Sequence, residues 1–407
     1  MNLDKTNEKL TKYGQTHLLS FFDELSDSEK NDLISQIEET DFEVIRAAFG
    51  AEDNKKGVIT PLKAMELSEI NENKAEFDEI GVNAIKDNKV AAVLLAGGMG
   101  TRLGSSNPKG MYNVGISREL FIFECLINNL MDVTNRVGNF IHLFVMTSEK
   151  NNDATINFFE EKNYFGYPKA FVHFFKQEMA PATDYEGKIY LETKSRLATS
   201  PNGNGGWFSS LKKAGLDSVL HDNGIEWLNI FAVDNVLQKI ADPVFVGATI
   251  KRDVAVGAKV VRKNHPDEGV GVMCLEDGRP SIIEYYELTD ELKSAVDESG
   301  NPAYNFGVIL NYLFNVSALE ALADDGLPLH IVKKKIEHID NTGNLVKPSE
   351  PNGFKYENLV LDMIHMMSGC LPFEVVREHE FAPIKNLTGI DSVESARALL
   401  TKNGVEL

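Results

Sequence analysis

Residues 90–110 read VAAVLLAGGMGTRLGSSNPKG. Val90 to Ala96 form an unbroken apolar run, which is typical of a strand buried on both faces of a sheet. Four glycines follow within the eight residues from Gly97 to Gly104. A glycine-rich loop after a buried strand lets backbone amides approach phosphates or a base closely, because no side chain blocks the way. The stretch therefore predicts an α/β fold with a nucleotide site after this strand.

Three kinds of functional glycine loop compete for this stretch. A dinucleotide fingerprint requires a third glycine where the chain has Leu103, and a P-loop requires Lys-Ser or Lys-Thr where it has Arg102-Leu103. In a nucleotidyltransferase loop an arginine and a following lysine bracket a triphosphate, and Arg102 and Lys109 fit that pattern. A tight turn without function is the remaining alternative. The glycines together with Arg102 and Pro108-Lys109-Gly110 favour the nucleotidyltransferase loop.

Buried strands and amphipathic helices alternate after this loop. The pattern favours a mostly parallel sheet flanked by helices. The expected strands are 142–146, 171–175 and 227–233, and the expected helices are 121–130 and 152–162. Beyond residue 254 the expected strands are 254–261, 270–275 and 281–285, and the turn signal Asp277-Gly278 predicts local antiparallel pairing there.

The two ends of the chain differ from this central part. Residues 1–88 have a helical pattern, with a capping box from Ser26 to Glu29 and a connector over residues 52–73. After residue 326 we expect a smaller unit with a helix near 355–368, a strand near 373–377 and a last helix beginning at Asp391-Ser392. The predicted division is a helical region (1–88), a central nucleotidyltransferase domain (89–325) and a C-terminal lid-like domain (326–407).

Composition excludes several classes of protein. The 407 residues carry 61 acidic and 41 basic side chains, and the net charge of −20 repels nucleic acid, so an anionic ligand needs a local basic pocket. The three cysteines are far apart in sequence, which predicts buried thiols rather than disulfides or a metal site. No signal peptide and no run of about 20 apolar residues is visible, so we expect a cytoplasmic protein without a membrane span. No obligate protein partner is evident.

From about residue 90 to 390 the chain resembles the UDP-N-acetylhexosamine pyrophosphorylases, within the broader UDP-sugar pyrophosphorylase group. The resemblance is carried by residues 95–110, 164–166, 174–177, 201–206, 233–235, 284–285, 347–348, 351–353 and 383–386. It implies a Rossmann-like, GT-A-like nucleotidyltransferase fold, with a mixed, mostly parallel sheet flanked by helices, a helical N-terminal region and a small C-terminal α/β unit. It also implies that UTP and N-acetylglucosamine 1-phosphate react to give UDP-N-acetylglucosamine and pyrophosphate.

The same resemblance implies roles for individual residues. Arg102, Lys109 and Lys385 would hold the phosphates and stabilise the transition state. Asp234, at the end of an apolar strand, would hold Mg2+. The uracil and nucleotide would be read by Gly97, Gly98, Gln177, Gly203 and Asn204. The sugar would be bound by Gly271, Glu284, Tyr285 and Asn305, with Lys355 as a further candidate.

Three positions depart from the pattern of the family. Phe306 and Val308 stand where the family usually has alanine and asparagine, and Tyr286 replaces a common serine. These changes concern the sugar and leave the reaction type untouched. Glucose or galactose 1-phosphate is therefore an alternative substrate, and a non-catalytic UDP-sugar-binding protein is an alternative of a different class.

Overall fold

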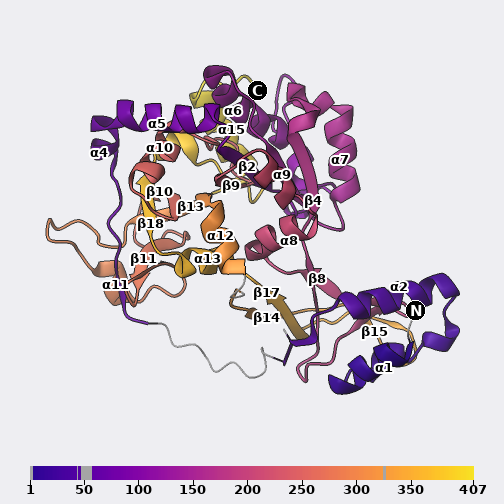
Figure 1. Cartoon of the computed structure of the whole chain (residues 1–407). Coiled ribbons are helices and arrows are strands. Elements are labelled where there is room, and N and C mark those ends of the chain that lie inside the picture. The colour runs from indigo at the N-terminus through magenta and orange to yellow at the C-terminus, as the bar shows by residue number, and fades with distance from the viewer. Residues whose placement is uncertain (1–2, 44, 47–56, 324–326) are drawn as a thin grey trace. The chain divides into compact units, whose positions relative to one another are not determined.

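The computed structural model describes residues 3–43, 45–46, 57–323 and 327–407 (Figure 1). Contacts between Cα atoms divide the chain into two compact units. The smaller unit consists of Met1–Lys55, Glu178–Gly206 and Leu327–Val360, and the larger consists of Lys56–Gln177, Trp207–Gly326 and Leu361–Leu407. Each unit is therefore assembled from segments that are far apart in sequence.

A single sheet forms the centre of the larger unit. Its strands, within the described residues, are β1 (Ile59–Pro61), β2 (Val90–Leu95), β3 (Leu143–Thr147), β4 (Val172–Lys176), β9 (Trp227–Ala232), β10 (Val256–Arg262), β11 (Val272–Glu276), β12 (Arg279–Ile283), β13 (Phe306–Asn315) and β18 (Cys370–Glu374). The main path runs β1-β11-β13-β9-β2-β3-β4; β10 pairs with β13 and β18, and β12 pairs with β11.

Strands β9, β2, β3 and β4 are parallel neighbours. Val93 of β2 lies opposite Ile230 of β9 on one side and Phe144 of β3 on the other. Their carboxyl ends consequently meet at one edge of the sheet, where ligands bind in α/β proteins. The remaining half is mainly antiparallel, since β13 is antiparallel to β9 and β10, and β11 forms a hairpin with β12. It is mixed because β18 runs parallel to β10.

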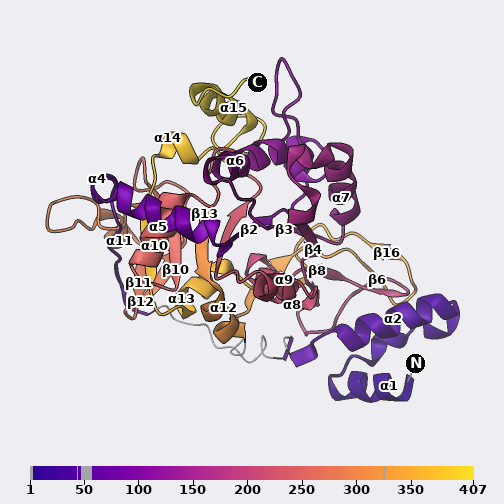
Figure 2. The ribbon, with the colours of Figure 1, turned by 45° about the horizontal axis from the view of Figure 1, so that its top comes forward.

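Helices cover both faces of the parallel strands. Those of the larger unit are α4 (Leu67–Glu72), α5 (Lys74–Lys86), α6 (Ile122–Val137), α7 (Asn152–Glu161), α8 (Trp207–Lys213), α9 (Asp217–Asp222), α10 (Pro243–Lys251), α11 (Asp290–Ser294), α12 (Val316–Ala323), α13 (Val360–Met366, whose first residue belongs to the smaller unit), α14 (Arg377–Glu380) and α15 (Val393–Lys402). Helices α6 and α7 lie on one side of β2, β3 and β4 (Figure 2), whereas α8 contacts β4.

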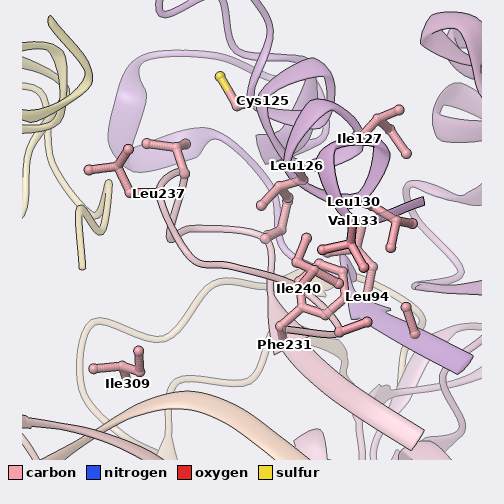
Figure 3. Packing of buried hydrophobic residues seen from close by; sticks show 14 of the residues in the cluster. Leu94, Cys125, Leu126, Ile127, Leu130, Val133, Phe231, Leu237, Ile240 and Ile309 are labelled. Atoms are coloured by element: carbon pink, nitrogen blue, oxygen red, sulfur yellow. The ribbon is translucent and has the colours of Figure 1, made fainter. Parts of the chain in front are cut away.

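The main core lies between this sheet and α6. Leu94 of β2 and Phe231 of β9 point toward Leu130 and Val133 of α6, and Ile240 closes the cluster (Figure 3). All five side chains are buried, and burying each such side chain contributes on the order of 1.5–3 kcal/mol. This packing fixes the end of β2, and with it the start of the glycine loop.

The smaller unit combines short strands with the N-terminal helices. Its elements include α1 (Leu3–Lys12), α2 (Asp27–Glu39), β5 (Met179–Pro181), β6 (Leu191–Thr193), β7 (Arg196–Leu197), β8 (Thr199–Pro201), β14 (His330–Lys334), β15 (His338–Ile339), β16 (Leu345–Val346) and β17 (Gly353–Glu357). Leu33 and Ile37 of α2 pack with Tyr356 of β17. The predicted capping box is confirmed, because Ser26 and Glu29 exchange hydrogen bonds at the start of α2.

Some sequence-based boundaries are corrected. Residues 353–357 form β17 where a helix near 355–368 was expected, because this segment pairs with β14 and buries Tyr356; the helix begins only at Val360. The strand expected near 373–377 is β18, which ends at Glu374. The connector predicted at 52–73 contains β1 and α4, and residues 52–56 lie outside the described part.

The α/β fold class and its flanked central sheet are confirmed. The division at 1–88, 89–325 and 326–407 stays a prediction; its last boundary falls at undescribed residues. In the structure, residues 327–360 belong to the smaller unit and residues 361–407 to the larger unit. Cys125 and Cys274 are buried free thiols, and Cys370 is a half-buried one. No helix in the described ranges has the length and apolarity needed to cross a bilayer.

Candidate active site

The glycine loop begins at the carboxyl edge of the parallel strands. Gly97 and Gly98 follow β2 directly; Gly98 is exposed, and a Cβ added there would meet no atom within 4 Å. The loop closes on itself, since the Lys109 amide donates to the Gly98 carbonyl at 3.1 Å. Arg102 lies on an exposed turn, Thr101–Leu103, inside this loop. The loop therefore presents open backbone and one arginine to solvent at the sheet edge.

Asn151 holds the beginning of this loop, a role that the sequence analysis missed. Its side chain is fully buried, and its Nδ2 donates to the Ala96 carbonyl at 2.9 Å and to the Gly98 carbonyl at 3.4 Å. Its Oδ1 accepts from the Ser148 amide at 2.7 Å. The available signal was its position shortly after β3, because the carboxyl ends of β3 and β2 share one edge.

Lys109 and Asp234 form an ion pair in the larger unit, and Arg102 and Lys385 are close enough for their charges to act on Lys109. Lys109 Nζ lies 3.7 Å from Asp234 Oδ2, and the two side chains are 16% and 25% exposed. Burial lowers the pKa of the Lys109 ammonium; Asp234 opposes that shift, and the positive charges of Lys385 and Arg102 reinforce it. Three cations and two carboxylates, the second being Asp391 at 3.0 Å from Lys385 Nζ, thus form a locally basic site in a chain of net charge −20.

The segment that carries Lys385 is tied to the segment that carries Asp234. The Ile384 amide donates to the Asp234 carbonyl at 2.9 Å. The buried Asn235 side chain donates to the Glu380 carbonyl at 2.7 Å and accepts from the Ala382 amide at 2.9 Å. These bonds explain how a residue near the C-terminus reaches the loop after β2.

Gln177 lies beside Gly97, as a shared base site would require. Gln177 follows β4 and is 8% exposed, and its backbone amide donates to the Thr147 carbonyl at 2.8 Å. A Cβ added to Gly97 would lie 3.0 Å from Gln177 Oε1. A side chain at residue 97 would displace Gln177 Oε1 by a few tenths of an ångström, whereas glycine leaves it in place. The primary amide of Gln177 can both donate to and accept from uracil.

Gly203, Asn204 and Lys355 belong to the smaller unit. Gly203 has φ 91°, and a Cβ there would lie 2.2 Å from the Asn358 carbonyl oxygen. Asn204 Oδ1 accepts from the Val360 amide at 3.1 Å. Lys355 lies in β17, which ends just before Asn358. The turn at 203–204 therefore packs against the segment that follows the strand of Lys355.

Two of the four predicted sugar residues in the larger unit converge. A Cβ added to Gly271 would lie 3.4 Å from Glu284 Oε1 and 3.5 Å from Val308 Cγ2. Tyr285 is 46% exposed, with its ring edge-to-face on Tyr286 at 5.2 Å. Val308, which departs from the family pattern, therefore faces Gly271 together with Ile282 and Glu284.

Asn305 and Phe306 lie in different surroundings. Asn305 lines a separate cavity of about 160 Å³ with Tyr304, Lys263 and Lys293. The ring of Phe306 lies 4.9 Å below the Arg262 guanidinium. That guanidinium is itself paired with Glu374 and Glu66, each at 2.7 Å. The ring of Phe306 therefore makes a cation–π contact with an arginine that two glutamates hold in place.

A resident metal site made of protein ligands alone is absent from the described ranges, where no three His, Cys, Asp or Glu side chains group suitably. Mg2+ commonly binds through one or two carboxylates and completes its shell with substrate phosphates and water. Asp234, a quarter exposed and opposite Lys109, fits a site of this kind.

Comparison with known proteins identifies the family. Residues 42–406 match the family described as UTP–glucose-1-phosphate uridylyltransferase. The chain is 35% identical to human UDP-N-acetylhexosamine pyrophosphorylase-like protein 1 over 97% of this chain and 83% of that protein. It is 34% identical to the UDP-N-acetylglucosamine pyrophosphorylase of Saccharomyces cerevisiae over 98% and 90%.

A solved structure agrees with these sequence matches. The uridine diphosphate N-acetylglucosamine pyrophosphorylase of Trypanosoma brucei superposes with a TM-score of 0.84 and is 27% identical, covering 98% of this chain and 84% of that one. The chain therefore belongs to the UTP–glucose-1-phosphate uridylyltransferase family, which includes the UDP-N-acetylglucosamine pyrophosphorylases.

Proposed function

We propose that this protein transfers a uridylyl group from UTP to N-acetylglucosamine 1-phosphate, giving UDP-N-acetylglucosamine and pyrophosphate. The observation that carries the proposal is the Lys109–Asp234 pair at the open glycine loop, to which the Lys385 segment is bonded and on which the charges of Arg102 and Lys385 act. The relatives that act by name on N-acetylglucosamine and match nearly the full chain support this choice of sugar.

The proposed reaction is an in-line displacement. A phosphate oxygen of the sugar phosphate attacks the α-phosphorus of UTP, the new P–O bond forms, and the bond to the β-phosphate oxygen breaks as pyrophosphate leaves. The protein contributes mainly position and charge. Arg102 can grip two phosphate oxygens, while Lys109 and Lys385 neutralise charge that accumulates on the leaving pyrophosphate.

Asp234 would hold Mg2+, which would neutralise the triphosphate when bound. Gly97, Gly98 and Gln177 would read the uracil and hold the nucleotide. Gly203 and Asn204 remain proposed nucleotide contacts. Gly271, Glu284, Tyr285, Asn305 and Lys355 remain the proposed sugar contacts. A cytoplasmic location is proposed, supported by the free thiols of the described cysteines. We propose no nucleic-acid, membrane or obligate protein partner.

The decisive experiment measures pyrophosphate release with UTP, Mg2+ and a panel of sugar 1-phosphates. We expect the highest kcat/KM with N-acetylglucosamine 1-phosphate. Preference for glucose or galactose 1-phosphate would replace the proposed sugar. The feature that favours this second candidate is Val308, which faces Gly271 together with Glu284. UTP binding without pyrophosphate release for any sugar would instead indicate a non-catalytic binding protein.

A further inference from the structure

The loop that carries Lys385 is closed by Asp391. The amides of Lys385 and Asn386 donate to the Asp391 carbonyl at 2.6 Å and 3.1 Å. Ser392 Oγ donates to the Gly389 carbonyl at 2.7 Å and caps α15, which begins at the next residue. The backbone of Lys385 is thus fixed to the start of a helix that belongs to the core of the larger unit.

The side chain of Asp391 holds the other end of Lys385. Its Oδ2 lies 3.0 Å from Lys385 Nζ, and the two side chains are 27% and 40% exposed. One residue therefore anchors both the peptide nitrogen and the ammonium of the same lysine. A free lysine side chain carries about 2 kcal/mol of rotamer entropy, so this anchoring removes much of the freedom that the ammonium would otherwise have.

The exposure of the pair argues against a role in stability. Ion pairs between partly exposed side chains usually contribute about 0–1 kcal/mol to folding. The position of the pair is a better guide. Ile384, the residue before Lys385, donates its amide to the Asp234 carbonyl at 2.9 Å, and Lys109 Nζ lies 3.7 Å from the carboxylate of the same Asp234. The charge of Lys385 accordingly acts on the ammonium of Lys109. A mobile Lys385 would be pushed away from Lys109 and Arg102, whereas a tethered one stays beside them.

We propose that Asp391 is a positioning residue for uridylyl transfer: its carboxylate holds the Lys385 ammonium beside Lys109 and Arg102 before the nucleotide arrives. This inference rests on the proposed function, in which Lys385 acts on the phosphates. Asp391 itself touches no substrate in this account. Asp391 contributes by holding the Lys385 ammonium in place beforehand, so that the entropy of this side chain is already lost before the reaction begins.

The backbone at residue 391 allows a clean test. Asp391 has φ 52°, a left-handed conformation that asparagine and glycine adopt readily. Asp391→Asn and Asp391→Gly therefore both remove the charge without straining the loop. Asp253→Asn is the matched control, because the exposed Asp253 also has φ 52°. We expect both Asp391 variants to lower kcat about tenfold, with KM for UTP within about twofold and Tm unchanged.

A double-mutant cycle with Lys385→Met separates positioning from a structural role. Rates are followed by exchange of radiolabelled pyrophosphate into UTP, which also measures slow variants. Asp391→Asn should lower kcat about tenfold in the wild-type background and less than twofold in the Lys385→Met background. An equal loss in both backgrounds, or no loss in either, would overturn the proposal. If Lys385→Met alone kept the wild-type rate, the proposed role of Lys385 in catalysis would fail instead.

Discussion

Lys109 Nζ and Asp234 Oδ2 lie 3.7 Å apart at the carboxyl edge of two adjacent parallel strands, β2 and β9. The pair places a cation and a candidate metal ligand opposite each other where the triphosphate is proposed to bind. The Asp234 carboxylate beside Lys109 and the Asp391 carboxylate beside Lys385 compensate part of the charge of the three cations. We expect nucleotide and metal together to take over these contacts, because phosphates are better partners for lysine and Mg2+ for the carboxylate.

Removing one phosphate-binding cation should slow the chemical step. We expect Arg102→Ala and Lys385→Ala each to lower kcat by about 10²–10³-fold, because the lost charge acts on the transition state. Steady-state rates of pyrophosphate release provide the measurement, and circular dichroism checks folding. Lys251→Ala is the control, since Lys251 is an exposed helix residue paired with Glu76. Near wild-type rates in both site variants would mean that the phosphate site lies elsewhere.

The pH dependence should report on Lys109. Burial lowers the pKa of its ammonium, so the charge is lost at lower pH than for an ordinary lysine. Activity should therefore decline on the alkaline side as pH rises through this lowered pKa. In Lys109→Arg the charge persists, because arginine keeps its proton to about pH 12 or above, and the alkaline limb should move to higher pH. Substrate ionisation is common to both proteins, so coincident limbs would exclude Lys109 as their source.

Gly97→Ala tests the base site. Its new Cβ would lie 3.0 Å from Gln177 Oε1, so that the side-chain amide must shift by a few tenths of an ångström. We expect KM for UTP to rise about tenfold, corresponding to one lost hydrogen bond of about 1.4 kcal/mol. KM for the sugar phosphate should change little. Gly269→Ala is the control, since an added Cβ there meets no atom within 4 Å. Equal KM values for UTP in both variants would count against the assignment of Gln177.

Gly271→Ala tests the sugar site. The added Cβ would lie 2.9 Å from Ile282 Cγ2 and would intrude beside Glu284 and Val308. KM for N-acetylglucosamine 1-phosphate should rise by at least about tenfold, while UTP binding measured by calorimetry stays unchanged. Weakened UTP binding instead would place Gly271 near the nucleotide.

A buried ionic cluster beneath the Lys385 segment predicts a large effect on stability. Lys259 is fully buried, and its Nζ contacts Glu380 at 2.6 Å and Asp242 at 3.3 Å. Burial opposes its charge, but the two carboxylates outweigh burial and raise the pKa of Lys259 above 10.5. Its contribution to stability is therefore present at neutral pH and is lost only as pH rises through that raised value.

Lys259→Met should lower the free energy of unfolding by about 3–5 kcal/mol, because it removes the buried cation that pairs with both Glu380 and Asp242 and leaves their charges uncompensated in the core. Denaturant titration measures this change. The exposed Lys251→Met should change the free energy by at most about 1 kcal/mol. A small effect at residue 259 would mean that Glu380 and Asp242 find other partners or become protonated.

Local sequence determined the strand of residues 90–95, the glycine loop after it, the capping box of α2, the start of α15, and the cations Arg102 and Lys109. These features depend on burial periodicity, on glycine's missing side chain and on hydrogen bonds that span a few residues, and all of them are encoded within one short segment. The resemblance to a family supplied Lys385, Asp234 and the sugar residues as expectations.

Only the tertiary structure decided which of these groups meet. It brought Lys385 to Lys109 through the bonds that join residues 380–384 to Asp234 and Asn235, and it assigned Asn151 and Asp391 their holding roles. It also turned residues 353–357 into a strand and placed Val308 beside Glu284. The reason is physical: strand pairing and long-range hydrogen bonds depend on which segments become neighbours in space. A short stretch of sequence does not specify which distant segment it will pair with.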